Sequence, residues 1–237
     1  MATFVLVHGA WHGGWCWRTT VGALEALGHE AHAPTLTGLG ERRHLIRADI
    51  TPDLHVEDVL AVMKWRELSD VILVGHSYGG IVATGVASAA PEQVAGLVYL
   101  DAFAPEESGV SPFAGANPAR MAKFVEQINA GAAGVAPDKF DAWTDDPDIR
   151  AWLETMCTDQ PAGTMLNGVT LTGREAEIAH RLFILAERNQ PSAFWGEYEK
   201  AKAKGWRTTR LPTKHDAMIE APEALAGLLS DFAAGLQ

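Results

Sequence analysis

Short apolar runs alternate with helix-like segments along most of this chain, and this alternation limits the folds open to it. In the first hundred residues, runs with the character of buried strands occupy residues 4–7, 29–33, 71–74 and 94–100. Segments with helical patterning separate them, at residues 17–27, 52–63 and 81–89. Apolar strands joined through helices pack as a parallel sheet covered on both faces. The sequence therefore predicts an α/β fold with a mostly parallel sheet flanked by helices.

The alternation stops after residue 104 and resumes near residue 181. It continues as strand, helix, strand and helix at residues 182–186, 194–202, 206–211 and 222–234. The intervening segment shows no clear strand, but it has helix-like pieces near residues 119–128 and 148–156. An insertion between parallel strands tends to lie over their C-terminal ends, where such sheets bind ligands. We predict a core of residues 1–104 and 181–237 and a helical cap of residues 105–180; an elaborate connection is the alternative.

Composition excludes several classes of partner. At 237 residues, with 47% apolar and 21% charged residues, the chain suits one domain with an insertion. A net charge of −11 argues against binding to nucleic acid or to anionic membranes, because both need a basic face on the protein.

Cys16 and Cys157 are too far apart in the sequence to match the spacing of a metal site. We expect both to be reduced thiols in the protein core. With no signal-peptide pattern and no run long enough to span a membrane, we expect a cytoplasmic protein.

The stretch VILVGHSYGG, residues 71–80, holds the strongest catalytic motif. Ser77 lies in a G-x-S-x-G pattern between a predicted strand and a predicted helix. In that context the pattern predicts a nucleophile elbow, a strained turn that lifts the serine hydroxyl above the sheet. The glycines are needed because the strand and helix backbones approach closely there. An idle serine in a glycine-rich turn is the alternative.

A serine hydroxyl needs a base, and the fold predicts a histidine in the last loop before the final helix. His215 lies in that loop, in the run TKHDAM, and we predict that it is the general base. We expect His8 and His76, which belong to motifs, to be structural. The second oxyanion donor should come from the loop after the first strand, which reads HGAWHGG. We predict that the backbone N–H groups of Ala10 and Tyr78 donate hydrogen bonds to the oxyanion of the tetrahedral intermediate.

Four stretches together resemble a known family. HGAWHGGW, GHSYGG, YLDAFAPE and HDAMIEAPE look like the α/β-hydrolase group of plant methyl esterases, plant hydroxynitrile lyases and small bacterial esterases. The resemblance runs nearly end to end, is weakest in the cap, and implies a six-stranded core. The lyases of this group resemble the chain except that they have threonine at the position of Gly9 and lysine at the position of Asp216. That lysine supplies the positive charge for departing cyanide, so the resemblance favours ester hydrolysis here.

The acid of the triad departs from the plant pattern. The position of the plant aspartate holds Asn189, which can orient an imidazole but cannot stabilise its charge. Glu187 lies slightly earlier in the chain. Asp101 follows the strand after the elbow, a place that resembles the acid position of haloalkane dehalogenases, although such a residue can also cap a helix. We predict that Asp101 is the acid, with Glu187 as the alternative. We exclude Asp216 because it directly follows His215 in the sequence, and such a neighbour does not easily reach the imidazole ring from behind.

These residues predict a serine carboxylesterase that forms an acyl-enzyme from small hydrophobic or aromatic esters. We expect Trp11, Phe113, Trp143 and Trp152 to bind substrate, although most aromatic residues of the cap will only pack it onto the core. No cofactor, metal, nucleic acid or membrane is implied; the predicted partner is a small-molecule ester. Two other functions remain open, a hydroxynitrile lyase and a small-molecule receptor with a nearly silent triad. The sequence also leaves open whether the chain forms a homodimer.

Overall fold

Six parallel strands form the centre of the molecule in a computed structural model that describes residues 1–113, 118–137 and 140–236. The strand order across the sheet is β2-β1-β3-β4-β7-β8. The strands are β1 (Thr3–Val7), β2 (Glu30–His32), β3 (Val71–His76), β4 (Val94–Leu100), β7 (Arg181–Ala186) and β8 (Arg207–Leu211). Every neighbouring pair is parallel, which confirms the predicted fold class. The central strands β3 and β4 are apolar along almost their whole length because both faces of the sheet are covered.

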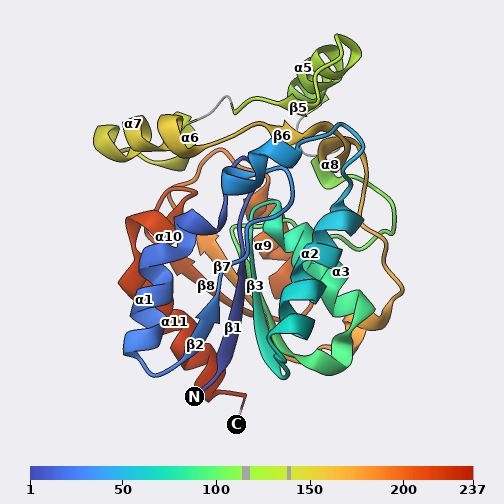
Figure 1. The fold of residues 1–237 in the computed structure, drawn as a ribbon. Coiled ribbons are helices and arrows are strands. Elements are labelled where there is room, and N and C mark those ends of the chain that lie inside the picture. The colour runs from blue at the N-terminus through green and yellow to red at the C-terminus, as the bar shows by residue number, and fades with distance from the viewer. Residues whose placement is uncertain (114–117, 138–139, 237) are drawn as a thin grey trace.

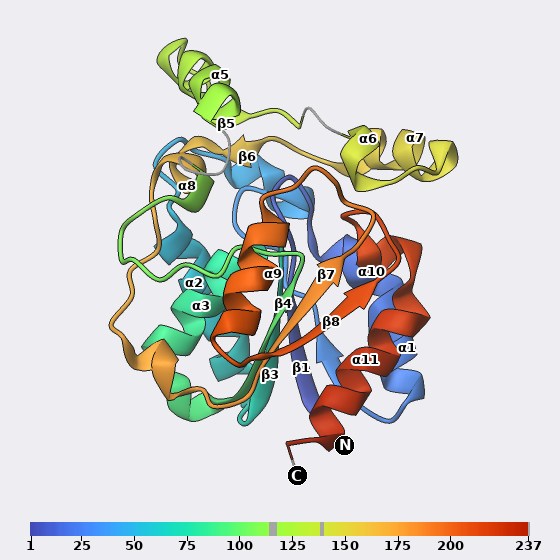
Figure 2. The same cartoon turned by 180° about the vertical axis from the view of Figure 1, so that it is seen from behind.

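Helices cover both faces of the sheet (Figure 1). One face carries α1 (Arg18–Ala26), α10 (Ala217–Glu220) and α11 (Pro222–Ala234). The other carries α2 (Pro52–Trp65), α3 (Gly79–Ala89) and α9 (Phe194–Ala203), as the reverse view also shows (Figure 2). The buried apolar side chains accordingly fall into two clusters, one on each side of the sheet. None of the helices in the described ranges is long and apolar enough to cross a membrane.

A third layer lies over the C-terminal ends of the strands (Figures 1 and 2). It contains the helices α5 (Pro118–Asn129), α6 (Phe140–Trp143), α7 (Pro147–Met156) and α8 (Ala162–Leu166). The predicted helices at 119–128 and 148–156 are confirmed to within one residue at each end. The expectation of no strand in this segment is wrong, because β5 (Gly134–Val135) pairs antiparallel with β6 (Gln160–Pro161). Strands of only two residues are too short to show an alternating pattern of apolar and polar residues in the sequence. Residues 114–117 and 138–139 of the predicted cap lie outside the described residues.

The turn from β3 into α3 brings several backbone segments into close contact. A Cβ atom added at Gly75 would lie 2.5 Å from the carbonyl oxygen of Gly79 and 2.6 Å from the Cα of Gly80. One added at Gly79 would lie 2.3 Å from the carbonyl oxygen of Val7, in β1. Real Cβ atoms do not approach backbone atoms this closely. Glycine is therefore required here because the strand, the helix and the neighbouring strand pack backbone against backbone.

We expect Gly75→Ala to destabilise the protein by at least about 2 kcal/mol, because a backbone rather than a flexible side chain would have to move. Gly22→Ala in α1 is the control, since a Cβ there meets nothing within 4 Å and alanine favours a helix. Urea unfolding of both variants measures the free energies. Equal stability of Gly75→Ala and the parent protein would contradict the close packing of this turn.

Candidate active site

Ser77 sits at the tip of the β3–α3 turn in a backbone conformation that non-glycine residues rarely adopt. Its φ is +55°. The N–H of Ser77 donates to the carbonyl of Leu100 at 3.2 Å, and its own carbonyl accepts from the N–H groups of Gly80 and Phe103, both at 3.2 Å. These bonds tie the strained turn to the end of β4, and strain of this kind persists only where the surroundings fix it. The side chain of Ser77 projects into a cavity beneath the cap.

Asp101 and His215 meet beside that cavity, although they are 114 positions apart in the chain. The ring Nδ1 of His215 lies 2.7 Å from Oδ2 of Asp101. Asp101 is fully buried, and its Oδ1 accepts the N–H of Ala186 at 3.2 Å. With Nδ1 facing Asp101, Nε2 is the nitrogen of His215 that can take a proton from Ser77, which lines the same cavity.

The other residues considered for the acid position take different places. Glu187 pairs at the surface with Arg210 at 3.3 Å, and 44% of its side chain is exposed. Asn189 donates through Nδ2 to Oδ2 of Asp101 at 2.6 Å and lies 3.3 Å from Nδ1 of His215. The amide therefore braces the carboxylate that contacts the imidazole. This role for Asn189 is not readable from sequence, because it depends on Asp101 reaching across from the neighbouring strand.

Ala10 and Tyr78 flank Ser77 from two loops. Ala10 follows β1, and Tyr78 precedes α3. Within the described parts of the chain, no group accepts a hydrogen bond from the backbone N–H of either residue. Buried N–H groups are nearly always paired, so two such donors beside a reactive hydroxyl suit an anionic oxygen that arrives with a substrate. The hydroxyl of Tyr78 is engaged elsewhere, 2.8 Å from Nδ1 of His55.

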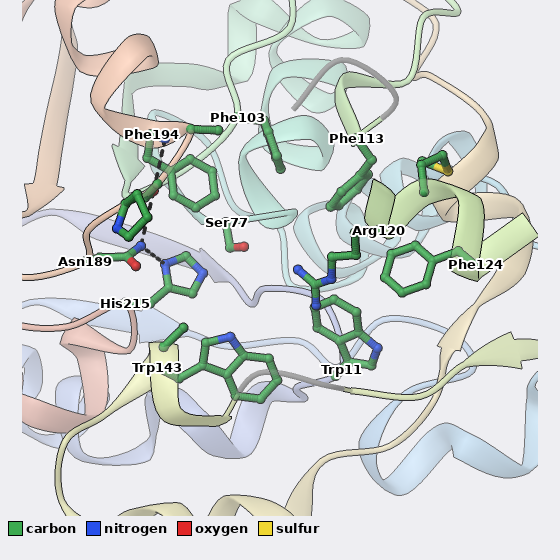
Figure 3. A pocket seen from close by; sticks show the side chains of 15 residues that line it. Trp11, Ser77, Phe103, Phe113, Arg120, Phe124, Trp143, Asn189, Phe194 and His215 are labelled. Carbon is green, nitrogen blue, oxygen red and sulfur yellow. Dashed lines mark hydrogen bonds between the residues drawn. The ribbon is translucent and has the colours of Figure 1, made fainter. Parts of the chain in front are cut away.

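The cavity above Ser77 has a volume of about 160 Å³ and aromatic walls. Figure 3 shows its main side chains around Ser77. Of the predicted substrate-binding residues, Trp11, Phe113 and Trp143 line it. Trp152 is not among the described lining residues; it packs edge-on against Trp15, with ring centroids 5.1 Å apart. The other lining residues are Ser77, Phe103, Arg120, Met121, Phe124, Ala142, Asn189, Pro191, Ser192, Ala193, Phe194 and His215.

A buried pair of charged groups lies behind the site. Oδ2 of Asp216 is 3.2 Å from Nε2 of His12, whose Nδ1 donates to the carbonyl of Ala10 at 2.8 Å. Burial alone would lower the pKa of His12, but the charge and hydrogen bond of Asp216 outweigh it and raise that pKa. Both side chains are almost fully buried. The pair thus joins the loop that carries Ala10 to the loop that carries His215.

His76, the last residue of β3, also contacts the loop that carries His215. Its Nε2–H donates to the carbonyl of His215 at 3.0 Å and lies 3.9 Å from Oδ1 of Asp216. Burial, together with the neighbouring His215 and His12, lowers the pKa of His76 well below the usual value, so this ring is neutral. Asp216 also donates its backbone N–H to the carbonyl of Trp143, which links the same loop to the cap. His76 and His8 are structural, as expected: His8 accepts the N–H of Leu36.

One group of side chains among the described residues has the proximity needed for a metal ion. Ligand atoms of His76, His215 and Asp216 lie within 4.8 Å of one another. Through other atoms each residue has a hydrogen-bond partner: His76 donates to a carbonyl, His215 faces Asp101, and Asp216 pairs with His12. Nδ1 of His76 and Oδ1 of Asp216 have no hydrogen-bond partner among the described residues.

Comparisons with known proteins give a consistent assignment. A family model described as "Alpha/beta hydrolase family" matches residues 4–228. The carbendazim hydrolyzing esterase of Nocardioides sp. (strain SG-4G) is 40% identical over 239 residues, covering 97% of this chain and 99% of that protein. The pyrethroid hydrolase of Sphingobium wenxiniae is 30% identical over 253 residues, covering 97% and 86%. In structure, an extracellular alpha/beta-hydrolase from a Paenibacillus species superposes with a TM-score of 0.86 at 21% identity, covering 98% of both chains.

We expect Asp216→Asn to lower the free energy of unfolding by about 1–3 kcal/mol at pH 7, because it removes the carboxylate that raises the pKa of His12 and is hydrogen-bonded to it. The double variant His12→Gln/Asp216→Asn should lose less than the sum of the two single variants, since neither charge remains. Urea unfolding of the four proteins gives the coupling free energy. Additive losses would contradict a direct interaction between these side chains.

The effect of Asp216→Asn should also depend on pH. A histidine whose pKa is raised by folding adds stability that is complete below its ordinary value of about 6.5 and is lost as the pH rises through the raised value. The difference between the parent protein and Asp216→Asn should therefore be larger at pH 6 than at pH 9. A difference that grows with pH would show that His12 is not held as a cation.

Proposed function

Since this chain belongs to the alpha/beta hydrolase family, we propose that it is a serine carboxylesterase that cleaves small hydrophobic or aromatic esters through an acyl-enzyme. The proposal is carried by one observation above all. A serine on a strained strand-to-helix turn and a histidine braced by a buried aspartate line the same cavity. The esterase and hydrolase names of the two full-length relatives agree with this activity.

In the first half of the reaction, Oγ of Ser77 attacks the carbonyl carbon of the ester while Nε2 of His215 accepts the hydroxyl proton. The negative charge that develops on the carbonyl oxygen is stabilised by the N–H groups of Ala10 and Tyr78. Asp101 holds the ring with Nδ1 toward itself and stabilises the imidazolium, and Asn189 in turn holds Asp101. The alcohol then leaves with the proton from His215, and the acyl group remains on Ser77.

In the second half, the same groups act on water. His215 takes a proton from a water molecule as that water attacks the acyl carbon, and the oxyanion again lies against Ala10 and Tyr78. Collapse of this intermediate returns the proton from His215 to Ser77 and releases the carboxylic acid. The aromatic walls, among them Trp11, Phe113 and Trp143, suit an apolar or aromatic group of the ester.

Cyanohydrin cleavage is not favoured by the residues behind the site. A Cβ at Gly9 would lie 2.9 Å from Nδ1 of His76 and 3.0 Å from Cβ of Ser77, so the position has little room for the threonine of the lyases. The position of their lysine holds Asp216, whose charge is negative and already paired with His12.

The other alternative is a small-molecule receptor with a nearly silent triad. Such a receptor would bind a ligand with hardly any turnover, whereas an esterase completes many turnovers.

We expect Ser77→Ala to reduce hydrolysis of p-nitrophenyl butyrate to the background rate, because the variant lacks the hydroxyl that the strained turn presents in the cavity shared with His215. Initial rates with purified protein measure the effect. The melting temperature of the variant should match that of the parent protein within a few degrees, which shows that the fold is retained. Equal rates for the two proteins at matched purity would overturn the assignment of Ser77.

A second pair of variants tests the acid. We expect Asp101→Asn to lower kcat on the order of 10³-fold or more, since the amide neither stabilises the imidazolium nor fixes its tautomer. Glu187→Gln, on the surface next to Arg210, should stay within about twofold of the parent protein. The measurement is kcat for p-nitrophenyl butyrate. A large loss in Glu187→Gln with little loss in Asp101→Asn would reverse the assignment.

A further inference from the structure

The loop that carries Ala10 also contains a residue in a strained backbone conformation. Trp11, which directly follows Ala10, has a φ of +66°. Such a value is rare for a bulky residue, because the Cβ atom then crowds the following carbonyl oxygen. Trp11 is buried, and its ring lines the active-site cavity (Figure 3). A strained residue of this kind keeps its conformation only where its surroundings hold it there.

The polar atoms of Trp11 are held by the layer that lies over the strand ends. The backbone N–H of Trp11 donates to Oε1 of Gln160 at 3.0 Å, and its carbonyl accepts the N–H of Thr158 at 2.9 Å. Its indole Nε1–H donates to the carbonyl of Val135 at 2.8 Å. Val135 and Gln160 face each other in the antiparallel pair of β5 and β6. This pair of strands therefore holds both the backbone and the ring of Trp11.

Gln160 is the partner that acts through its side chain, and it is fully buried. The directions of its hydrogen bonds are fixed, because the backbone N–H of Trp11 can only donate and must face Oε1. Nε2 then donates to the hydroxyl of Thr164 at 2.6 Å, and that hydroxyl donates to the carbonyl of Pro161 at 2.7 Å. A buried amide that is bonded at both ends specifies one geometry, because a shift would leave a buried polar group without a partner.

The carbonyl groups on either side of Ala10 are held as well. The carbonyl of Gly9 accepts from Nδ1 of His8, and the carbonyl of Ala10 accepts from Nδ1 of His12, both at 2.8 Å. The N–H of Ala10, by contrast, has no acceptor in the described parts of the chain. Relaxation of Trp11 to a negative φ would rotate the peptide unit between Ala10 and Trp11. The bond from Trp11 to Gln160 opposes that rotation.

We infer that Gln160 is a positioning residue of the oxyanion hole: it holds the N–H of Trp11 and thereby keeps the N–H of Ala10 directed at the oxyanion of the substrate. This inference rests on the proposed esterase function and extends the groups that support it to the layer over the strand ends. Gln160 is not among the described residues that line the cavity, so it acts through Trp11 and Ala10. The alternative is that Gln160 only fastens β6 to the core, a role that would affect stability but not the recognition of an oxyanion.

The test uses an inhibitor that forms an oxyanion in the site. When 1,1,1-trifluoro-4-phenylbutan-2-one binds, Oγ of Ser77 adds to its carbonyl carbon, the hydroxyl proton passes to His215, and the ketone oxygen becomes the oxyanion of a tetrahedral adduct. The corresponding alcohol, 1,1,1-trifluoro-4-phenylbutan-2-ol, has a similar shape but cannot form this adduct. In Gln160→Met the inhibition constant of the ketone should rise at least about tenfold, while that of the alcohol stays within about twofold. The kcat/KM for p-nitrophenyl butyrate should fall by a factor similar to the rise for the ketone, because hydrolysis passes through the same kind of oxyanion.

Ser111→Ala is the matched control. It removes another buried hydrogen bond from the same layer, the bond from the hydroxyl of Ser111 to the carbonyl of Met165 at 2.7 Å, and should leave the ratio of the two inhibition constants unchanged. Gln160→Asn is a second test variant, because its shorter amide does not reach the N–H of Trp11. It should weaken inhibition by the ketone relative to the alcohol, and it replaces Gln160→Met if the melting temperature shows that Gln160→Met does not fold.

The outcomes separate three roles of Gln160. Equal losses for the ketone and the alcohol would overturn the inference, since Gln160 would then shape the cavity through the ring of Trp11. Unchanged inhibition by both compounds together with a lower melting temperature would also overturn it and assign Gln160 a packing role alone. Absence of turnover with p-nitrophenyl butyrate in the parent protein would contradict the esterase, whereas turnover that does not depend on Gln160 would contradict only this inference.

Discussion

The close contact of backbones at the β3–α3 turn is the constraint on which the rest of the site depends. Only glycine at positions 75 and 79 lets the strand and helix approach closely enough to force Ser77 to a φ of +55°. The same turn is hydrogen-bonded to the end of β4, so the position of Ser77 and that of Asp101 are set together. A hydroxyl on a flexible loop would have to be ordered in each catalytic cycle, whereas this one is ordered by the fold.

Around this turn, buried polar contacts hold together loops that are distant in sequence. Asp101 fixes the ring of His215 from one side, and the His12–Asp216 pair connects the loop of His215 with the loop of Ala10 from behind. Buried charges of this kind add little net stability, but removing one partner is costly. Their contribution is to geometry, because they prevent the loop that carries His215 and the loop that carries Ala10 from shifting independently. The layer over the strand ends adds aromatic side chains, among them Phe113 and Trp143, to the walls of the cavity.

Local sequence signals were enough to predict the fold and two of the cap helices, because the apolar period and the alternation of strands and helices are properties of neighbouring residues. The prediction of Ser77 came from a motif, that of His215 from its place in the fold, and that of Asp101 from a family resemblance. Contacts between distant side chains leave no such signal in the sequence. Asn189, which follows β7, donates a hydrogen bond to Asp101, which follows the neighbouring strand β4. Trp152 was expected to bind substrate, but it packs against Trp15. The sequence cannot distinguish these two cases, because an aromatic residue on a cap helix can pack against a neighbour as readily as it can face the cavity.

The central claim is that Ser77 is the nucleophile, and covalent labelling tests it most directly. Diethyl 4-nitrophenyl phosphate transfers its phosphoryl group to activated serines and releases 4-nitrophenolate. Intact-mass measurement should show one diethylphosphoryl group per chain, with one equivalent of 4-nitrophenolate released, and peptide mapping should place the group on Ser77. Absence of labelling, or labelling of another residue with the Ser77 peptide unmodified, would contradict the account.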